Sequence, residues 1–239
     1  RQVNIEDLLG REIVELDSVP ITKYLQNRTI LITGAGGSIG SEIARQIIPF
    51  NPQKIILLGK GENSIFNIAN EIKSSFPEIK IETVIADITN NNAIKKIFNS
   101  YKPDVIFNSA AHKHVYLMEL NAGECFKNNV IGTMTLMQAA IEEGVKQFVQ
   151  ISTDKAVHPT STMGATKRIT ELVMKAYSSN TDCVFSAVRF GNVLGSRGSV
   201  IPIFKEQIAK GGPVTVTHPE AIRYFMTIPE AAQLVIQSC

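Results

Sequence analysis

The stretch RTILITGAGGSIG, residues 28–40, decides the fold of this chain. Residues 28–33 form a short apolar, β-branched run, which is typical of a strand buried on both faces of a parallel sheet. Glycines follow at once, and between residues 38 and 50 isoleucines recur at helical spacing along one face. A strand, a glycine-rich turn and a helix in this order predict the first unit of a Rossmann-type fold.

The glycine-rich turn predicts a site for the pyrophosphate of a dinucleotide. Without a Cβ atom the backbone can turn tightly and approach phosphates, which the N–H groups at the start of the helix then bind. A glycine triplet alone is a weak signal, but the strand before it and the helix after it supply the confirming context. The spacing is G-x-x-G-x-x-G with one additional glycine, and we expect the pyrophosphate to contact Gly34, Gly36, Gly37, Ser38, Ile39 and Gly40.

The alternation of strand and helix continues as far as residue 190. Apolar runs predict further strands at 54–58, 80–87, 104–110, 147–153 and 183–190. Helical patterns lie between them at 63–75, 91–100, 122–143 and 164–178. Strands separated by helices of this length form crossover units. The predicted fold class is therefore α/β, a Rossmann-type doubly wound parallel sheet.

The pattern before and after this region predicts three parts in the chain. Residues 1–27 are polar and irregular, apart from a short amphipathic piece around Ile5–Leu9, and we expect a lead-in segment. Residues 28–190 form the nucleotide-binding domain. Residues 191–239 contain glycine-rich segments and a short TVT strand at 215–217, and predict the start of a smaller C-terminal substrate lobe. Since the chain begins at Arg1 and stops within a helical pattern, we expect it to be part of a longer protein.

The composition excludes several classes of function. A net charge of +2, no basic stripe and no Trp argue against nucleic acid as a partner. The three cysteines, Cys125, Cys183 and Cys239, are odd in number and widely spaced, which fits a reducing compartment rather than a disulfide framework or a zinc knuckle. The longest apolar runs have the length of a strand, and no signal peptide is visible, so we expect no membrane contact from this segment.

The residues at the adenosine end of the cofactor site allow more than one interpretation. Gly59 stands where an acidic residue usually holds the ribose hydroxyls, and Lys60 beside it could instead meet a 2′-phosphate. Glu62 could serve the ribose or begin the next helix. Asp87 and Ile88, at the end of the third strand, suit contact with the adenine. The choice between NAD and NADP therefore stays open.

The end of the fourth strand and the residues after it predict further contacts. Asn108, Ala110 and Ala111 lie where small side chains let a cofactor pass close, although plain helix–sheet packing would also explain them. The run His112-Lys113-His114 with Glu119 offers too few converging ligands for a metal site, and we predict none. We expect Lys113 to meet the substrate or its phosphates.

Long blocks of the sequence resemble one family. They are DLLGREIVELD (7–17), TGAGGSIGSE (33–42), AAHKHVYLME (110–119), ISTDKAVHPTSTMGATKR (151–168), RFGNVLGSRGSVIPIF (189–204) and HPEAIRYFMTIPEA (218–231). Together they resemble the CapD-like UDP-N-acetylglucosamine 4,6-dehydratases, which belong to the extended short-chain dehydrogenase/reductase superfamily. The resemblance implies a UDP-sugar substrate, a recycled NAD or NADP, a homo-oligomer and a cytoplasmic location. In the family an N-terminal membrane region often precedes the catalytic part, which would then be the cytoplasmic domain of an inner-membrane protein.

The resemblance also implies catalytic roles. Most of the superfamily pairs a Tyr with a Lys four residues later, but this chain has Met163 before Lys167, and a thioether cannot accept a proton at neutral pH. Thr153 is then expected at the C4 hydroxyl of the sugar and Lys167 at the nicotinamide ribose. Asp154 is expected to act as the acid and Lys155 as the base of the elimination, although a solvated loop pair is the simpler explanation.

The segments that bind UDP in the family contain Asn192, Arg197, Ser199 and Arg223. An arginine fork suits a pyrophosphate, whereas a structural ion pair is an equally good explanation of Arg223. The predicted activity is a nucleotide-sugar 4,6-dehydratase for surface glycan synthesis, with an internal hydride cycle and loss of water. The alternatives are a UDP-sugar 4-epimerase and a non-catalytic nucleotide-binding module. A hydrolase is disfavoured because no G-x-S-x-G elbow occurs.

Overall fold

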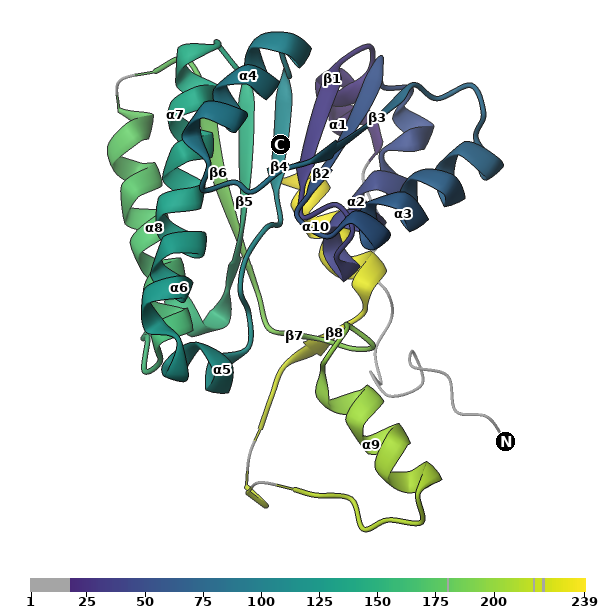
Figure 1. Ribbon diagram of the computed structural model, residues 1–239, viewed down its shortest axis with the longest axis vertical. Coiled ribbons are helices and arrows are strands. Elements are labelled where there is room, and N and C mark those ends of the chain that lie inside the picture. The colour runs from purple at the N-terminus through teal and green to yellow at the C-terminus, as the bar shows by residue number, and fades with distance from the viewer. Residues whose placement is uncertain (1–17, 180, 217, 221) are drawn as a thin grey trace.

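A six-stranded parallel sheet forms the centre of the molecule (Figure 1). The structure is a computed structural model that describes residues 18–179, 181–216, 218–220 and 222–239. The strand order is β3-β2-β1-β4-β5-β6, and every neighbouring pair is parallel, as the sequence predicts. The strands are β1 (Thr29–Thr33), β2 (Lys54–Gly59), β3 (Ile81–Ile85), β4 (Val105–Asn108), β5 (Gln147–Thr153) and β6 (Val184–Phe190).

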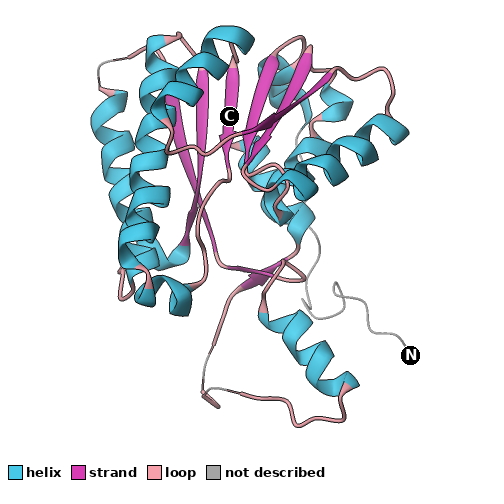
Figure 2. Cartoon of the chain, viewed as in Figure 1, coloured by secondary structure: helices cyan, strands magenta, loops and turns pink. Residues whose placement is uncertain are grey.

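Helices cover both faces of this sheet (Figure 2). One apolar core joins the sheet to α1 (Ser18–Leu25), α2 (Ser38–Gln46), α3 (Glu62–Ser75) and α10 (Ile228–Gln237). The second core joins the opposite face to α4 (Asn91–Tyr101), α7 (Gly132–Glu142) and α8 (Thr162–Ser178). The strand order reverses between β1 and β4, and the crevice outside the carboxyl ends of these strands is where doubly wound folds bind their ligands.

Two helical segments differ from the prediction. Within the segment predicted to be an irregular lead-in, Ser18–Leu25 form α1. This helix forms because Ile21 and Leu25, four residues apart, are both buried against the core. Ile5–Leu9 lies outside the described residues. The helix predicted over 122–143 consists of α6 (Ala122–Phe126), a π-helical turn (Lys127–Ile131) and α7, and a further short helix, α5 (Val115–Leu120), precedes it.

The segment after residue 190 contains two kinds of element. A short parallel pair, β7 (Asn192–Val193) and β8 (Phe225–Met226), lies beyond the main sheet, and α9 (Val200–Ala209) extends from it without a buried residue (Figures 1 and 2). In contrast, α10 packs on α2 in the core of the main sheet. The smaller C-terminal lobe and its boundary at residue 190 stay predictions.

The predicted TVT strand is wrong for residues 215 and 216, and Thr217 lies outside the described residues. The backbone N–H of Thr215 donates to the side chain of Gln207 on α9 rather than to a neighbouring strand. Val216 is 66% exposed, so no packing holds this segment in an extended ladder. Among the helices that the structure describes, none combines the length and apolarity needed to cross a bilayer.

Candidate active site

The glycine-rich turn between β1 and α2 forms a cradle that excludes side chains. Gly34 has a φ of 61°, and a Cβ placed there would lie 2.8 Å from the backbone nitrogen of Ala110. A Cβ at Gly40 would collide with the carbonyl oxygen of Gly34 and lie 2.6 Å from Ser109 Oγ. Gly37 precedes α2 without a capping side chain, so the first N–H groups of that helix stay open to a ligand. This backbone fits a pyrophosphate.

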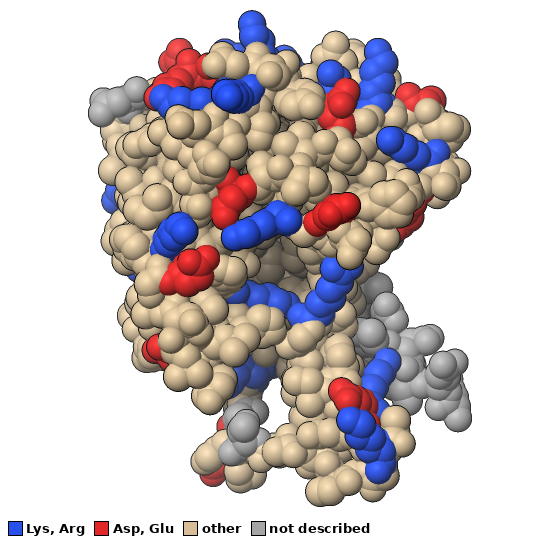
Figure 3. All heavy atoms as spheres, viewed as in Figure 1, with Lys and Arg blue, Asp and Glu red and all other residues tan. Residues whose placement is uncertain are grey.

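One cavity of about 540 Å³ connects this cradle with the carboxyl end of β5 and the segment after β6. Figure 3 shows a hollow at the centre of the viewed face, with basic side chains beside it. Most residues predicted to act on cofactor or sugar line the cavity, namely Gly37, Ser38, Ile39, Gly40, Ala111, Lys113, Thr153, Lys155, Met163, Lys167, Asn192, Arg197 and Ser199. The fold therefore gathers residues from widely separated segments into one site.

The turn after β5 joins the predicted catalytic residues in one network. Lys155 Nζ lies 2.9 Å from Asp154 Oδ1 and 3.2 Å from Asn192 Oδ1. Thr153 Oγ1 donates to the same Asp154 oxygen at 2.9 Å. Burial alone would raise the pKa of Asp154, but the hydrogen bonds from Lys155 and Thr153 outweigh it and lower the pKa. The carboxylate of Asp154 is therefore ionised at neutral pH.

Met163 and Lys167 lie one turn apart on α8 and both line the cavity. Lys167 Nζ donates to the carbonyl oxygen of Ile151 at 2.9 Å, and burial lowers the pKa of this amine to about 8. Met163 is 4% exposed and packs with Met118 and Cys125. The position that carries the superfamily's Tyr is therefore an apolar wall of the site.

A buried carboxylate on α8, not singled out from the sequence, holds the end of β5. Glu171 accepts from Ser152 Oγ at 2.6 Å and from two nitrogens of the Arg189 guanidinium. Arg168 approaches the same carboxylate at 3.2 Å. Burial would raise the pKa of Glu171, but these hydrogen bonds and charges lower it. The available sequence signal is spacing, because Glu171 follows Lys167 by four residues on the same face of α8.

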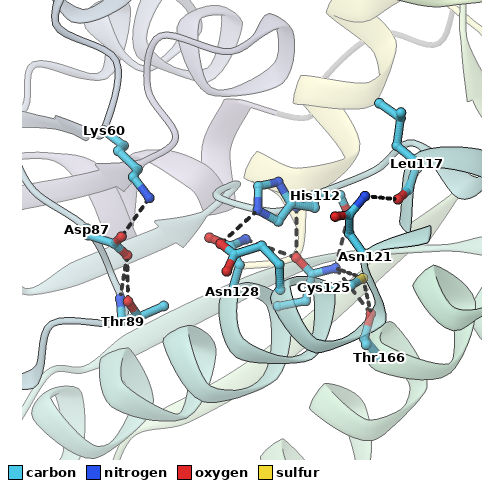
Figure 4. Close-up of polar contacts among 11 residues, drawn as sticks. Lys60, Asp87, Thr89, His112, Leu117, Asn121, Cys125, Asn128 and Thr166 are labelled. Carbon is cyan, nitrogen blue, oxygen red and sulfur yellow. Dashed lines mark hydrogen bonds and ion pairs between the residues drawn. The ribbon is translucent and has the colours of Figure 1, made fainter. Parts of the chain in front are cut away.

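At the adenosine end, two predicted cofactor residues pair with each other (Figure 4). Lys60 Nζ lies 2.8 Å from Asp87 Oδ2, and the backbone and hydroxyl of Thr89 donate to Asp87 Oδ1. Burial would raise the pKa of Asp87, but these partners lower it to about 2. Glu62 is exposed at the start of α3, and Ile88 is buried in the core. The structure thus brings Lys60 and Asp87 together and leaves Ile88 to packing.

The side chain of Asn108 is fully buried. It accepts from Thr33 Oγ1 on β1 and donates to Thr133 on α7 and to Gln150 on β5. Its side chain therefore ties β1, β4 and β5 together below the site. Of the two alanines predicted to let a cofactor pass, Ala111 lines the cavity and Ala110 packs against the second core, so their contact with a cofactor stays a prediction.

The loop after β4 is held by Asn129, which the sequence analysis missed. Its amide accepts from the backbone N–H of His112 at 2.8 Å, donates to the carbonyl of His112 at 3.0 Å, and donates to Thr166 at 3.1 Å. The π-helical turn carries Asn129. Figure 4 shows His112, Cys125 and Thr166 in one group of polar contacts. His112 also lies 3.6 Å from Glu124. Within the described part of the chain, no cluster of three metal-ligating side chains occurs.

The residues predicted to bind UDP separate into two groups. Asn192, Arg197 and Ser199 line the cavity. Arg223 is exposed outside it, and its guanidinium donates to the carbonyl of Ile222 at 2.7 Å. No described carboxylate forms an ion pair with Arg223, so the structural ion pair is absent among the described residues, and the contact of Arg223 with UDP stays a prediction.

Comparison with known proteins places this site in context. The model of the family described as "Polysaccharide biosynthesis protein" matches residues 30–239. The capsular polysaccharide biosynthesis protein CapD of Staphylococcus aureus is 57% identical over 240 residues, which cover all of this chain and 40% of that protein. The chain thus spans less than half of that relative's length.

More distant relatives have named activities. A UDP-N-acetylglucosamine 4,6-dehydratase (inverting) of Campylobacter jejuni is 32% identical over 88% of this chain and 63% of its own length. A UDP-glucose 4-epimerase of Rickettsia canadensis is 30% identical over 88% of this chain and 62% of its own length. This chain is therefore related to nucleotide-sugar dehydratases and epimerases alike.

Solved structures confirm the fold. Pen from Bacillus thuringiensis superposes with a TM-score of 0.84 at 33% identity, covering 90% of this chain and 66% of that one. DesIV of Streptomyces venezuelae, a dTDP-glucose 4,6-dehydratase with NAD and TYD bound, superposes with a TM-score of 0.76 at 25% identity over 86% and 70% of the two chains.

Proposed function

This chain belongs to the polysaccharide biosynthesis protein family, and on that premise we propose that it carries the active site of a UDP-N-acetylglucosamine 4,6-dehydratase. The product would be a UDP-4-keto-6-deoxy-N-acetylhexosamine for surface glycan synthesis. The observation that carries the proposal is the Asp154–Lys155 pair after β5, of which Lys155 lines the cavity together with Met163. An epimerase has no water to expel and no need of such a pair.

The cofactor site supports this proposal. The cradle at Gly34–Gly40 and the open N-terminus of α2 would hold the diphosphate of NAD or NADP. Lys167 would hold the nicotinamide ribose from the wall of the cavity. When bound, the cofactor supplies a hydride acceptor for sugar C4 and a hydride donor for C6. The remaining chemistry is proton transfer, which the side chains of this chain must perform.

The side chains around the sugar would divide the proton transfers. Thr153 Oγ1 donates to Asp154 and accepts from the backbone N–H of Lys155 at 3.4 Å, which leaves one lone pair to accept from the C4 hydroxyl. Asp154 would protonate the departing C6 hydroxyl, and Lys155 would remove and return the C5 proton. The C4 hydroxyl proton would pass through Thr153 Oγ1 to Asp154 Oδ1 across their 2.9 Å contact, and Asp154 would then give this proton to the departing C6 hydroxyl. Overall, the C4 hydroxyl proton and the C6 hydroxyl leave as water.

Met163 would act by exclusion. A buried thioether offers no proton acceptor at the position of the usual Tyr, so Thr153 would be the polar group nearest the C4 hydroxyl. The apolar surface of Met163 with Met118 and Cys125 would keep water from the oxidised sugar. The proposal thus explains why the tyrosine is dispensable in this site.

Product analysis tests the proposal directly. The protein is incubated in D₂O with UDP-N-acetylglucosamine and either NAD or NADP, and products are identified by NMR. A 4-keto-6-deoxy sugar with deuterium at C5 and no net cofactor reduction is expected. Lys155→Ala should lower turnover at least about a hundredfold, whereas Lys175→Ala, an exposed control on α8, should not. Formation of UDP-N-acetylgalactosamine would instead establish an epimerase, and binding of cofactor without any UDP-sugar a non-catalytic module.

We also propose that the protein pairs with a second copy of itself. α6, the π-helical turn and α8 contact one another and expose apolar side chains, of which Phe126 is 44%, Ile131 40% and Leu172 51% exposed. Burying such a surface is favourable in water. Sedimentation velocity should show a dimer that Leu172→Glu converts to a monomer, and a monomeric wild-type protein at all concentrations would exclude the pairing.

A further inference from the structure

The segment between β7 and α9 folds into two consecutive turns that carry a single arginine. Gly195 and Gly198 have φ values of 72° and 67°, a conformation that favours glycine. Ser196 Oγ donates to the carbonyl of Val193 at 2.9 Å, and the N–H of Ser199 donates to the carbonyl of Ser196 at 3.0 Å. These bonds define residues 195–199, the bridging turn, and place Arg197 at its middle.

Arg197 reaches the glycine-rich cradle rather than the β5 end of the cavity. Its backbone N–H donates to Ser38 Oγ at 3.1 Å. Its guanidinium donates to the carbonyl oxygen of Gly36 at 3.0 Å. Two bonds, one from the backbone and one from the side chain, thus tie this residue to the cradle. The guanidinium therefore lies beside the backbone that is expected to hold a pyrophosphate.

The bridging turn is also fastened to the loop after β4. Lys113 Nζ donates to Ser196 Oγ at 3.4 Å. The imidazole of His114 lies over Gly198, where an added Cβ would approach its Cε1 atom to 2.7 Å. The turn therefore spans the cavity from the cofactor cradle to the side where Lys113 and Ser199 face the predicted UDP site.

Within the described part of the chain, no acidic side chain balances the charge of Arg197. No described carboxylate forms an ion pair with it, and Gly36 is its guanidinium's single hydrogen-bond acceptor among the described residues. A guanidinium has several N–H groups in a planar fork, so most of them stay available for oxygens of an anion. Lys113, the other cation on this wall, likewise has no described carboxylate partner, and burial lowers its pKa.

We propose that Arg197 binds the diphosphate of the dinucleotide cofactor and that the bridging turn couples cofactor binding to the UDP-sugar site. This replaces the sequence-based expectation that Arg197 binds UDP, and it rests on the proposed function for the presence of two nucleotide ligands. Because the bridging turn borders both ligands, binding of one ligand should order the turn and so favour binding of the other. Such coupling is reciprocal between the two ligands.

Calorimetric titration tests the assignment without catalysis. NAD and NADP are titrated into nucleotide-free protein, first alone and then with saturating UDP. Loss of a charge-assisted contact in Arg197→Ala should weaken cofactor affinity by roughly tenfold or more, and Arg197→Lys, which keeps the charge but not the fork, by less. Arg28→Ala, a matched change at the opposite end of β1, should leave the affinity unchanged. In wild type UDP should tighten cofactor binding, and in Arg197→Ala this gain should shrink.

Other outcomes overturn the proposal. Cofactor affinity of Arg197→Ala within twofold of wild type, with loss confined to UDP, would make Arg197 a substrate residue. An equal cofactor affinity with and without UDP in wild type would remove the coupling. Should Arg197→Ala not fold, the lysine variant carries the same comparison. These titrations are independent of product formation, so a wild-type protein without dehydratase activity would refute the proposed function and not this assignment.

Discussion

Replacing Lys167 by Met should change the stability of this protein in a direction that depends on pH. Lys167 is buried on α8, and its ammonium has one hydrogen-bond acceptor among the described residues, the carbonyl oxygen of Ile151 at 2.9 Å. Methionine has a similar length and no charge. The substitution therefore removes the unfavourable burial of a charge, and it also removes one hydrogen bond.

The magnitude of each effect follows from the environment of Lys167. Its pKa is about 8 in the folded protein and 10.5 ordinarily, a difference that corresponds to about 3 kcal/mol against the charged folded state. Loss of the charge-assisted bond to Ile151 costs about 1.5–3 kcal/mol. At pH 7 the two effects oppose each other, so Lys167→Met should be between neutral and about 1.5 kcal/mol more stable than wild type.

The sign of the pH dependence follows from proton binding. Between about pH 8 and 10.5 the unfolded lysine binds a proton that the folded lysine has lost, so wild-type stability rises with pH across this window. The free-energy penalty of burying the charged Lys167 ammonium is fully present below pH 8 and decreases above it. Lys167→Met lacks this titrating group, so its free energy of unfolding should fall by about 2–3 kcal/mol relative to that of wild type between pH 7 and pH 10.

Urea unfolding of nucleotide-free protein at a series of pH values measures this difference. Other groups that titrate in the same range are common to both proteins and cancel. Lys210→Met, an exposed control, should show no pH-dependent difference, since its side chain is 72% exposed. If the stability difference between Lys167→Met and wild type stays constant from pH 7 to pH 10, Lys167 does not carry a buried charge and the reasoning fails.

Three further predictions follow from single contacts. Gly34→Ala should cost about 2–4 kcal/mol in urea unfolding, because of its positive φ and the 2.8 Å approach to Ala110, and should abolish cofactor binding in calorimetry. Thr227→Ala removes the capping box of α10 and should cost about 1 kcal/mol by the same measurement, without affecting cofactor affinity. Lys60→Ala should raise the pKa of Asp87 from about 2 toward 3.8 in a carboxyl NMR titration, and an unchanged value would remove Lys60 as a cause.

The elements of the main sheet could be predicted because each has a local pattern. The β1 run, for instance, has three consecutive aliphatic residues between two threonines, and all five residues are buried because both faces of the strand are covered. The elements missed have weak local signals. The side chains that hold α1 make their apolar contacts only when the core is assembled. β7 and β8 are two-residue strands that pair across distant parts of the chain.

Within the site, the sequence predicted which residues belong to it better than it predicted the groups that those residues contact. Gly34, Lys155 and Lys167 follow from motifs, because turn geometry and helix spacing are local properties. No local sequence pattern supported the prediction that Arg197 and Arg223 bind the same ligand, and the structure places the two arginines apart. Asn129 and Glu171 were missed because each acts on a backbone or side chain that is distant in sequence.

The sequence by itself determined that a dinucleotide cradle follows the first strand and that a Thr-Asp-Lys run ends the fifth. Both depend on short-range backbone and side-chain chemistry. Only the tertiary structure decided that Lys60 pairs with Asp87, that Glu171 holds Ser152, and that Arg197 reaches the carbonyl of Gly36. These contacts join residues many positions apart, and their energies depend on distance and burial, which exist only after the chain has folded.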